Sequence, residues 1–300
     1  MSDFKIMTFD GGGIKGLVTA IIVQRLKKDF PELLERCSMY AGTSTGAIIA
    51  LGLGSGLRIE RIRSLYEVEG ARIFRRRWQH WFGLTGAKYT NAELKKLLNE
   101  VLGDITLGEL PQKVLVPAFD LMSDTPPICW KPKFFHNFKA DDSDCRRYAS
   151  DVALYSSSAP TYFKAYHGYV DGGMVANNPS MAAVAQALDD RYDPVLKLED
   201  IRLLSIGTGK TNKYKEGESY DFGALQVKSL VDIMLGGTES VPDYQCKVIL
   251  DDRYHRCEPT DSREIEMDDV SRIPELVEIG YNFDISPALA WLEDNWSDNA

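Results

Sequence analysis

The sequence predicts an α/β fold in which a sheet is sandwiched between helices. Short apolar segments, of the kind that form buried strands, alternate with segments whose apolar residues recur every three or four positions. Glycine-rich turns separate several of these pairs. Alternation of this kind is typical of strands that are connected by helices covering the sheet.

The first two strand and helix pairs lie close to the N-terminus. Phe4–Phe9 is short and largely apolar, the glycines after Asp10 end it, and a helical pattern follows over Leu17–Leu26. A second strand is expected over Met39–Thr43. A second helix is expected over Gly46–Leu51, where glycine and alanine allow close packing against neighbouring elements.

Further elements follow along the chain. Thr90–Glu93 has the spacing of a capping box and predicts a helix that stops at Gly103. Buried strands are expected over Lys113–Phe119 and Ile201–Ile206, with a helix over Ser180–Leu188 between them.

The chain shows no internal repeat, low-complexity run or linker, so we expect one domain over residues 1–300. Its motifs lie within residues 4–209, and residues 214–300 give the weakest structural pattern. The charged stretch Asp251–Asp269 is expected to be a solvated loop.

Composition excludes several classes of protein. The chain has 35 Lys and Arg against 44 Asp and Glu, a net charge of -9, which argues against a nucleic-acid binder because such a protein needs an excess of cations on one face. The longest weakly polar stretch, Ala47–Leu57, is far shorter than the ~20 apolar residues that cross a bilayer. The strand at Phe4–Phe9 leaves no room for a secretory leader. We therefore expect a cytoplasmic protein, one that can still associate peripherally with a membrane.

The five cysteines are an odd number and have no CxxC spacing. They indicate neither a disulfide framework nor a zinc site. Buried or incidental thiols are expected.

Gly42–Gly46 reads Gly-Thr-Ser-Thr-Gly, a G-x-S-x-G pattern at the junction of a predicted strand and a predicted helix. This is the setting of a nucleophile elbow, a strained turn that presents a serine hydroxyl at a helix N-terminus, where the dipole favours negative charge. Gly42 and Gly46 matter because larger side chains would clash with nearby backbone. Ser44 is therefore a candidate nucleophile, and a small-residue helix start is the alternative.

A second candidate is the loop Asp10–Gly16, which reads Asp-Gly-Gly-Gly-Ile-Lys-Gly and opens a helix. Such a loop can direct several backbone N–H groups at a phosphate or an oxyanion. Gly11, Gly13 and Gly16 also satisfy G-x-G-x-x-G. The dinucleotide-binding interpretation is weak, however, because the acidic residues about 20 positions further on precede the next predicted strand instead of ending it.

Two further glycine segments look like turns. Gly207–Thr211 is similar to a phosphate loop, but Leu204 stands where the leading glycine would be needed, so we predict a plain turn after a strand. On composition alone, Asp171–Gly173 is also a turn, placed before a helix that starts near Pro179.

In combination, however, Asp10–Gly16, Gly42–Gly46 and Asp171–Gly173 resemble the motifs of the patatin-like phospholipase family, in its bacterial stand-alone form. Further segments similar to that family are Tyr155–Phe163, Asp171–Pro179 and Leu204–Gly209. The resemblance covers roughly Phe4–Gly209. It implies a three-layer α/β/α fold with a mainly parallel central sheet.

The resemblance also implies a Ser–Asp dyad, with Ser44 as nucleophile and Asp171 as general base. It implies an oxyanion hole formed by backbone N–H groups of Gly11, Gly12 and Gly13. The motif residues that would support this site are Lys15, Gly16, Gly42, Gly46, Gly172 and Gly173. Lys15 departs from the arginine more common in the family, so the charge is kept and the bidentate fork is lost.

A carboxylate is a weaker base than an imidazole, since the unperturbed pKa is ~3.9 for Asp and ~6.5 for His. We expect burial beside Ser44 to raise the pKa of Asp171. The oxyanion loop would supply further catalysis, since one such donor is typically worth about 3 kcal/mol.

The function so implied is that of a serine lipid acyl hydrolase of the phospholipase A type. It would cleave fatty-acyl esters of phospholipids or other acyl lipids at a transient membrane surface, with no metal and no organic cofactor. The alternatives are an esterase or thioesterase of soluble substrates, and a catalytically silent nucleotide-binding or interaction module. Some bacterial members of the family are effectors that a small signal such as a cyclic nucleotide switches on, and nothing in the sequence indicates such a switch.

A Ser–Asp–His triad is the rival of the dyad. The four histidines are His80, His136, His167 and His255. Only His255 follows Ser44 and Asp171 in the chain order of α/β-hydrolases. It lies in a polar run, so we expect a solvated histidine on a surface loop.

The segment Arg72–Phe82 combines clustered arginines with Trp78 and Trp81, and Gly83 and Gly86 follow it. That composition suits a membrane interface, where aromatic rings lie at headgroup level and cations meet anionic lipid. The alternative is a partly buried lid with a charged outer face. Both interpretations place a cover near a lipid site.

Overall fold

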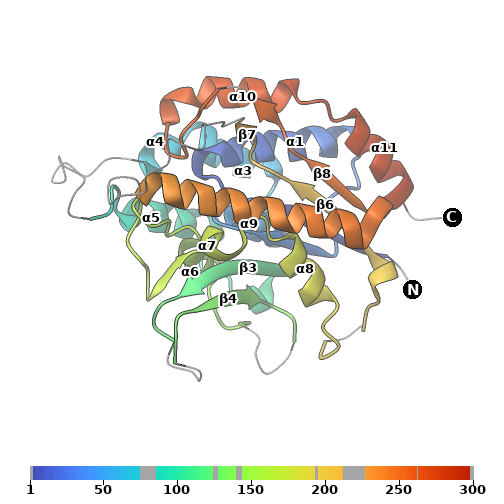
Figure 1. The fold of residues 1–300 in the computed structure, drawn as a ribbon, viewed down its shortest axis with the longest axis horizontal. Helices are drawn as coiled ribbons and strands as arrows, with labels where there is room; N and C mark the ends of the chain where they lie inside the picture. The colour runs from blue at the N-terminus through green and yellow to red at the C-terminus, as the bar shows by residue number, and fades with distance from the viewer. Residues whose placement is uncertain are drawn as a thin grey trace, which may run out of the picture.

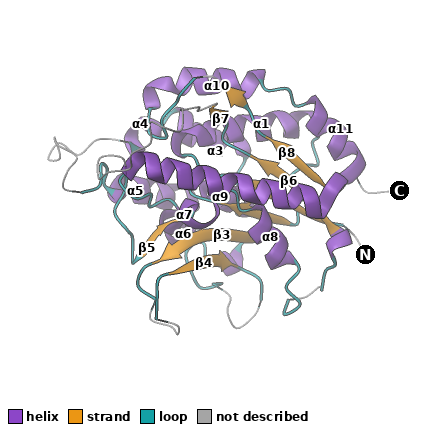
Figure 2. Cartoon of the chain, in the orientation of Figure 1, coloured by secondary structure: helices purple, strands orange, loops and turns teal. Residues whose placement is uncertain are grey.

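The computed structural model describes residues 3–74, 86–123, 128–139, 144–192, 195–211, 227–261 and 263–297. Within those ranges a seven-stranded mixed sheet lies between two layers of helices (Figure 1). Figure 2 shows helices on both sides of the sheet. The predicted three-layer α/β/α fold is confirmed.

The sheet has the order β4-β3-β2-β1-β6-β8, with β5 paired to β3. Its strands are β1 (Phe4–Phe9), β2 (Met39–Gly42), β3 (Lys113–Asp120), β4 (Lys131–His136), β5 (Tyr169–Asp171), β6 (Ile201–Ile206) and β8 (Tyr254–Cys257). The strands β3, β2, β1, β6 and β8 are parallel to one another, whereas β4 and β5 run antiparallel to β3. A separate parallel pair joins β7 (Lys210–Thr211) to β9 (Thr260–Asp261).

Helices cover both faces. They are α1 (Gly16–Asp29), α2 (Thr45–Gly54), α3 (Ile59–Glu67), α4 (Gly70–Ile73), α5 (Asn91–Leu102), α6 (Ala149–Ser156), α7 (Gly173–Ala176), α8 (Ser180–Ala187), α9 (Val227–Leu250), α10 (Ile273–Asn282) and α11 (Ser286–Asn295). Side chains alternate along each strand: in β1, Met7 and Phe9 pack with α1, α2 and α10, whereas Ile6 packs on the opposite face with α8 and the end of α9.

The predicted helix after Thr90 is present as α5, but its capping box is only half formed. The Thr90 hydroxyl accepts a hydrogen bond from Ala92 N at 3.3 Å. The Glu93 carboxylate is held instead by the Arg72 guanidinium at 3.1 Å.

Residues 214–300, which gave the weakest pattern, contain α9, β8, α10 and α11. The prediction of a solvated loop over Asp251–Asp269 is wrong where β8 pairs with β6, because Tyr254 and Cys257 are buried there. The charged residues that suggested solvent, Arg256 and Glu258, are paired with each other inside the protein.

All five cysteines are free thiols, and Cys37, Cys246 and Cys257 are buried, as expected. Among the helices of the described ranges, none combines the length and the apolar character needed to cross a membrane. Most of the Arg72–Phe82 segment, from residue 75 onward, and His80 with it lie outside the described residues. The guanidinium of Arg72 forms ion pairs with Glu69, Glu93 and Glu100.

Candidate active site

Ser44 occupies a tight turn between β2 and α2. Its backbone has φ 54° and ψ -117°, a conformation that is rare for a residue with a side chain and marks stored strain. The flanking glycines explain how the turn fits. A Cβ at Gly42 would lie 2.0 Å from Gly46 O, and a Cβ at Gly46 would lie 2.1 Å from Phe9 O.

The sheet brings Asp171 to this turn. β2 pairs with the first half of β3, at Lys113–Leu115, and β5 pairs with the second half, at Ala118–Asp120. On the other side of this half, β3 pairs with β4, so β2 and β5 share one edge. Because β2 is parallel to β3 and β5 is antiparallel, the two strands run toward each other and their last residues meet.

The side chains of the two residues are in direct contact. Ser44 Oγ donates a hydrogen bond to Asp171 Oδ2 at 2.7 Å, and the other carboxylate oxygen accepts one from Gly173 N at 2.7 Å. Gly172 and Gly173 allow this close packing, since a Cβ at Gly172 would lie 2.2 Å from Pro117 O and one at Gly173 would lie 2.7 Å from Leu235 Cδ2. Both members of the pair are buried.

Burial sets the proton affinity of Asp171. Desolvation raises its pKa to about 6, and the hydrogen bonds from Ser44 and Gly173 lower it in part. The direction agrees with the expectation from sequence. A carboxylate with this pKa is a stronger base than an ordinary aspartate and is still ionised at neutral pH.

The glycine loop lies beside Ser44, and its three N–H groups are not equivalent. Gly11 N donates to Asn177 O at 3.0 Å, so the prediction that it serves an oxyanion is wrong for this residue. Within the described residues the N–H groups of Gly12 and Gly13 have no partner, and both glycines line the cavity that contains Ser44. Two donors are therefore left for an oxyanion.

The loop holds its shape through close contacts that exclude side chains. Gly13 has φ +61°, and a Cβ there would lie 2.2 Å from Met267 O. A Cβ at Gly12 would lie 2.4 Å from Thr208 Oγ1, and one at Gly16 would lie 2.2 Å from Thr45 Oγ1.

The Gly207–Thr211 segment does more than turn the chain. Thr208 Oγ1 donates to Gly11 O at 3.0 Å, and Thr19 Oγ1 donates to Gly207 O at 2.8 Å. Lys15 Nζ reaches Gly209 O at 3.5 Å. The segment therefore holds the glycine loop in place through hydrogen bonds. The sequence, which predicted a plain turn, did not indicate this role.

Asp10, which precedes the glycine loop, is fully buried and paired with Arg256 of β8. Arg256 Nη1 and Nη2 donate to the two carboxylate oxygens of Asp10 at 3.0 and 2.5 Å, and Nη1 also donates to Ser205 Oγ at 2.7 Å. Burial raises the pKa of Asp10 to about 7, although the guanidinium beside it lowers that pKa in part. Sequence reasoning missed this pair because its members lie far apart in the chain.

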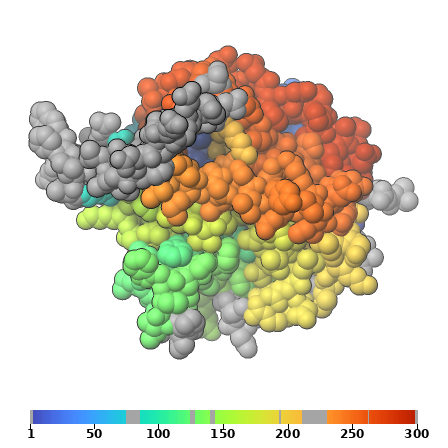
Figure 3. Space-filling view, viewed as in Figure 1, coloured from blue at the N-terminus to red at the C-terminus, as the bar shows by residue number. Residues whose placement is uncertain are grey.

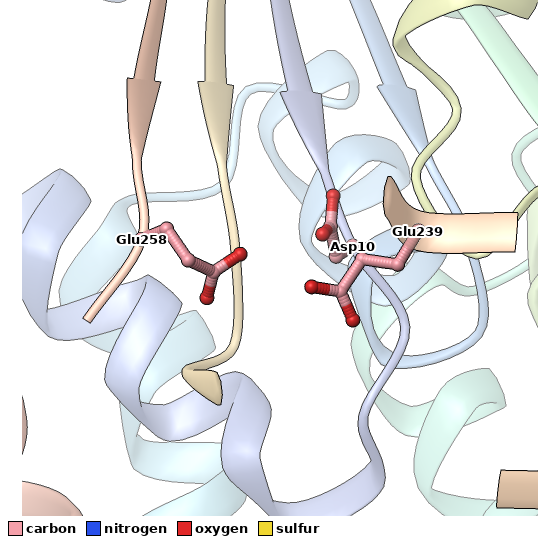
Figure 4. Close-up of side chains that lie close together, drawn as sticks. All are labelled: Asp10, Glu239 and Glu258. Atoms are coloured by element: carbon pink, nitrogen blue, oxygen red, sulfur yellow. The ribbon is translucent and has the colours of Figure 1, made fainter. Parts of the chain in front are cut away.

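Figure 4 shows Asp10 with two further carboxylates, those of Glu239 and Glu258. Oxygen atoms of the three lie within 4.8 Å of one another, a spacing that a metal ion could use. Arg256 contacts all three, with Glu258 hydrogen-bonded and Glu239 at 3.6 Å. The Arg256 guanidinium therefore lies among these carboxylates, and Lys210 pairs with Glu239 at 3.3 Å, so the cluster forms an ion-pair network.

The cavity beside Ser44 and Asp171 has an apolar wall. Ile48, Ile73, Phe74, Leu94, Phe163 and Leu235 contribute to it. An apolar chain could therefore lie along this wall with a polar group at its end placed beside Ser44 and the N–H groups of Gly12 and Gly13.

The histidines that the structure describes stand apart from this cavity. His136 is buried in β4, and the ring of His167 stacks on Tyr166. His255 is half-buried in β8 and stacks on Trp291, with ring centroids 5.8 Å apart, so the expectation of a solvated loop histidine is wrong. None of these three lines the cavity.

Comparison with known proteins gives consistent results. Residues 7–184 match the family model described as patatin-like phospholipase. The protein CotR of Bacillus subtilis is 28% identical over 329 residues, covering 99% of this chain and 99% of that protein. A cGAMP-activated phospholipase of Pseudomonas aeruginosa is 28% identical over 282 residues, covering 88% of this chain and 81% of that protein.

Among solved structures, VipD from Legionella pneumophila has a TM-score of 0.53 to this chain at 12% identity. The match covers 98% of this chain and 67% of VipD. At this identity the likeness is one of fold alone.

Gly46→Ala should destabilise the fold by about 2 kcal/mol or more, because the new methyl group would collide with the Phe9 carbonyl of the central strand. Gly236→Ala is the control, since no atom lies within 4 Å of its Cβ position in α9. Alanine there should be neutral or stabilise by about 0.5–1 kcal/mol. Urea unfolding monitored by circular dichroism measures both, and equal stability of Gly46→Ala and wild type would contradict the turn geometry.

Arg256→Gln should cost about 3–5 kcal/mol at pH 8, because it leaves the Asp10 carboxylate buried without a cation. The deficit should shrink at pH 5, since protonation of Asp10 removes the buried charge. Arg25→Gln is the control: that half-buried arginine donates to the carbonyls of Gly280 and Phe283, and its loss should cost about 1–2 kcal/mol with little pH dependence. Similar losses at both pH values for Arg256→Gln would exclude a charged Asp10.

Proposed function

The chain belongs to the patatin-like phospholipase family, whose members are lipid acyl hydrolases, and we propose that it cleaves fatty-acyl esters of glycerophospholipids through an acyl-Ser44 intermediate. The observation that carries this proposal is the 2.7 Å hydrogen bond from Ser44 Oγ to Asp171 Oδ2 at the end of an apolar cavity. Ser44, Asp171 and two N–H groups that have no partner in the described part of the chain lie together there, beside space for an acyl chain.

In the first half of the reaction, Ser44 Oγ attacks the ester carbonyl carbon and its proton passes to Asp171 Oδ2. The negative charge that develops on the carbonyl oxygen is stabilised by the N–H groups of Gly12 and Gly13. The carbon–oxygen bond to the leaving alcohol then breaks. The alcohol departs with the proton from Asp171, and the acyl group stays on Ser44.

In the second half, a water molecule attacks the acyl carbon and gives its proton to Asp171. The bond to Ser44 Oγ breaks, Ser44 recovers the proton, and the fatty acid leaves. Esters suit this pair better than amides because an alcohol is a better leaving group than an amine. The raised pKa of Asp171 supports both directions of proton transfer near neutral pH.

The proposal is tested by incubating the protein with a mixed lipid extract and analysing the products by mass spectrometry. We expect free fatty acids and the matching lysophospholipids, absent with Ser44→Ala. Turnover that rises only above the aggregation threshold of the lipid supports a phospholipase, whereas turnover of soluble monomers alone supports the esterase or thioesterase alternative. Failure of a phosphonate probe to label Ser44 would support a catalytically silent module.

The same assay with added cGAMP tests whether this chain shares the activation named for its Pseudomonas aeruginosa relative. Activation would appear as a higher product yield at equal protein concentration.

Ser44→Ala should reduce ester hydrolysis to the uncatalysed background with the fold intact, because it removes the attacking oxygen. Asp171→Asn should lower kcat by about 10²- to 10⁴-fold, since an amide keeps the shape and accepts no proton. Asp120→Asn is the matched control, a buried carboxyl group at the end of the neighbouring strand β3. Substantial activity in a folded Ser44→Ala protein, or an inactive His255→Ala protein, would rule out the dyad.

The dependence of kcat/KM on pH should report Asp171. The base must be ionised to accept the serine proton, so activity on a soluble nitrophenyl ester should be lost as the pH falls through about 6, the pKa of this group. Below that point the rate should fall about tenfold per pH unit, and above it the rate should level off. A midpoint near pH 4 would show that the base is an unperturbed carboxylate.

A further inference from the structure

Helix α9 presents an apolar stripe to solvent. The exposed large apolar residues on it are Leu230, Ile233, Met234, Val241, Tyr244, Val248 and Ile249. At about 100° per residue, the exposed apolar positions from Leu230 to Val248 fall within roughly 100° of the helix circumference, and Ile249 lies outside this sector. Figure 3 shows α9, in orange, across the face of the molecule turned toward the viewer.

The charged side chains of α9 are directed elsewhere. Asp243 accepts hydrogen bonds from Tyr254 and Lys247, and Glu239 lies against Arg256 and Lys210. Among the α9 residues from 230 onward, Lys247 is the one exposed charged side chain. In a chain with a net charge of -9, this face is unusual in carrying almost no charge.

The other face of the same helix belongs to the cavity. Val231 and Leu235 line it together with Ser44 and Asp171. Leu230 and Met234, which are exposed, are their direct neighbours in sequence. If a lipid layer lies against the stripe, an acyl chain would therefore pass from the exposed side of α9 to the side that lines the cavity to reach the site.

We propose that this stripe, the outer face of α9 from Leu230 to Val248, is the surface that docks on a lipid bilayer. The proposal rests on the proposed function, which requires a substrate held in a lipid surface. A helix with apolar residues on one face and polar residues on the other lies in a membrane interface with its apolar face buried by about 5–10 Å.

The size of the stripe favours a bilayer over a second copy of the chain. From Leu230 to Val248 the helix is about 27 Å long, and a face about 10 Å wide gives roughly 270 Å². A stable protein interface needs about 800 Å² from each partner, with complementary shape. A bilayer needs no matching shape, and it can cover a single narrow helix face.

Docking through such a surface relies on burial of apolar side chains. Binding to zwitterionic phosphatidylcholine vesicles should therefore persist in about 0.5 M salt, because apolar burial is not screened. A surface built on the arginines of the 72–82 segment would behave in the opposite way, with binding to anionic vesicles that salt abolishes.

The test uses Ser44→Ala protein, so that vesicle binding is measured without hydrolysis. One variant adds Val241→Gln, Tyr244→Gln and Val248→Gln, whose side chains are 55%, 69% and 64% exposed and lie away from the cavity. The control adds Val68→Gln, Ile128→Gln and Val195→Gln, which are 76%, 79% and 56% exposed and lie outside α9. Glutamine is a good helix former, so α9 should remain folded.

In flotation with phosphatidylcholine vesicles, the α9 variant should bind at least about tenfold more weakly, and the control should bind as the parent does. With Ser44 restored, hydrolysis of a soluble nitrophenyl ester should be equal in both. A Tyr244→Trp protein gives an independent measurement: brominated phosphatidylcholine should quench its fluorescence more than that of wild type.

Three results would overturn the proposal. They are unchanged vesicle binding by the α9 variant, binding that salt abolishes, and a wild-type dimer that the α9 substitutions convert to monomer. Failure of the proposed function is a separate outcome. In that case the α9 face would still bind vesicles, but no lipid would be hydrolysed when Ser44 is present.

Discussion

The candidate site depends on β2 and β5 ending against each other on one edge of β3. A slip of β5 by one residue would move Asp171 by about 3.3 Å and turn its side chain to the other face of the sheet. Contacts from α6 fix the register independently: Gly172 N donates to Ser156 O, and Ser44 N donates to Ser156 Oγ. The end of α6 therefore contacts both halves of the pair, and the strand register brings the side chains of Ser44 and Asp171 within reach of the 2.7 Å hydrogen bond.

Burial raises the pKa of two aspartates near the glycine loop, Asp10 and Asp171, but the partners of the two groups differ. Both carboxylate oxygens of Asp10 accept hydrogen bonds from the Arg256 guanidinium, which lowers in part a pKa that desolvation raises to about 7. Among the described residues no cation contacts Asp171, which accepts hydrogen bonds from one hydroxyl and one backbone N–H, and desolvation raises its pKa to about 6. The first carboxylate is suited to anchoring the loop and the second to exchanging a proton. Each role comes from the partners, because both groups are equally shielded from water.

Most of the parallel sheet could be predicted from sequence, because β1, β2, β3 and β6 are short, largely apolar runs, and glycines lie at or just after the ends of β1, β2 and β6. β8 could not, since Arg256 and Glu258 look solvated until their partners from distant segments are known. α9 carries Gly236, Gly237 and Pro242, residues that argue against a helix, and its stability comes instead from packing on α7 and α8.

At the site, the motifs predicted which residues would be near each other. They could not predict that Gly11 N–H donates a hydrogen bond to Asn177 O, because that bond depends on the path of the folded backbone.

The position of α9 connects the proposed lipid-docking stripe with the Ser44–Asp171 pair. Thr238 Oγ1 donates to Gly173 O at 2.9 Å, and Leu235 Cδ2 would lie 2.7 Å from a Cβ at Gly173. Gly173 N in turn holds a carboxylate oxygen of Asp171. A displacement of α9 against a bilayer would therefore act first on the segment that orients the base. The apolar stripe and the Ser–Asp pair are separated by a single layer of contacts, so docking and the alignment of the reacting groups share one structural element.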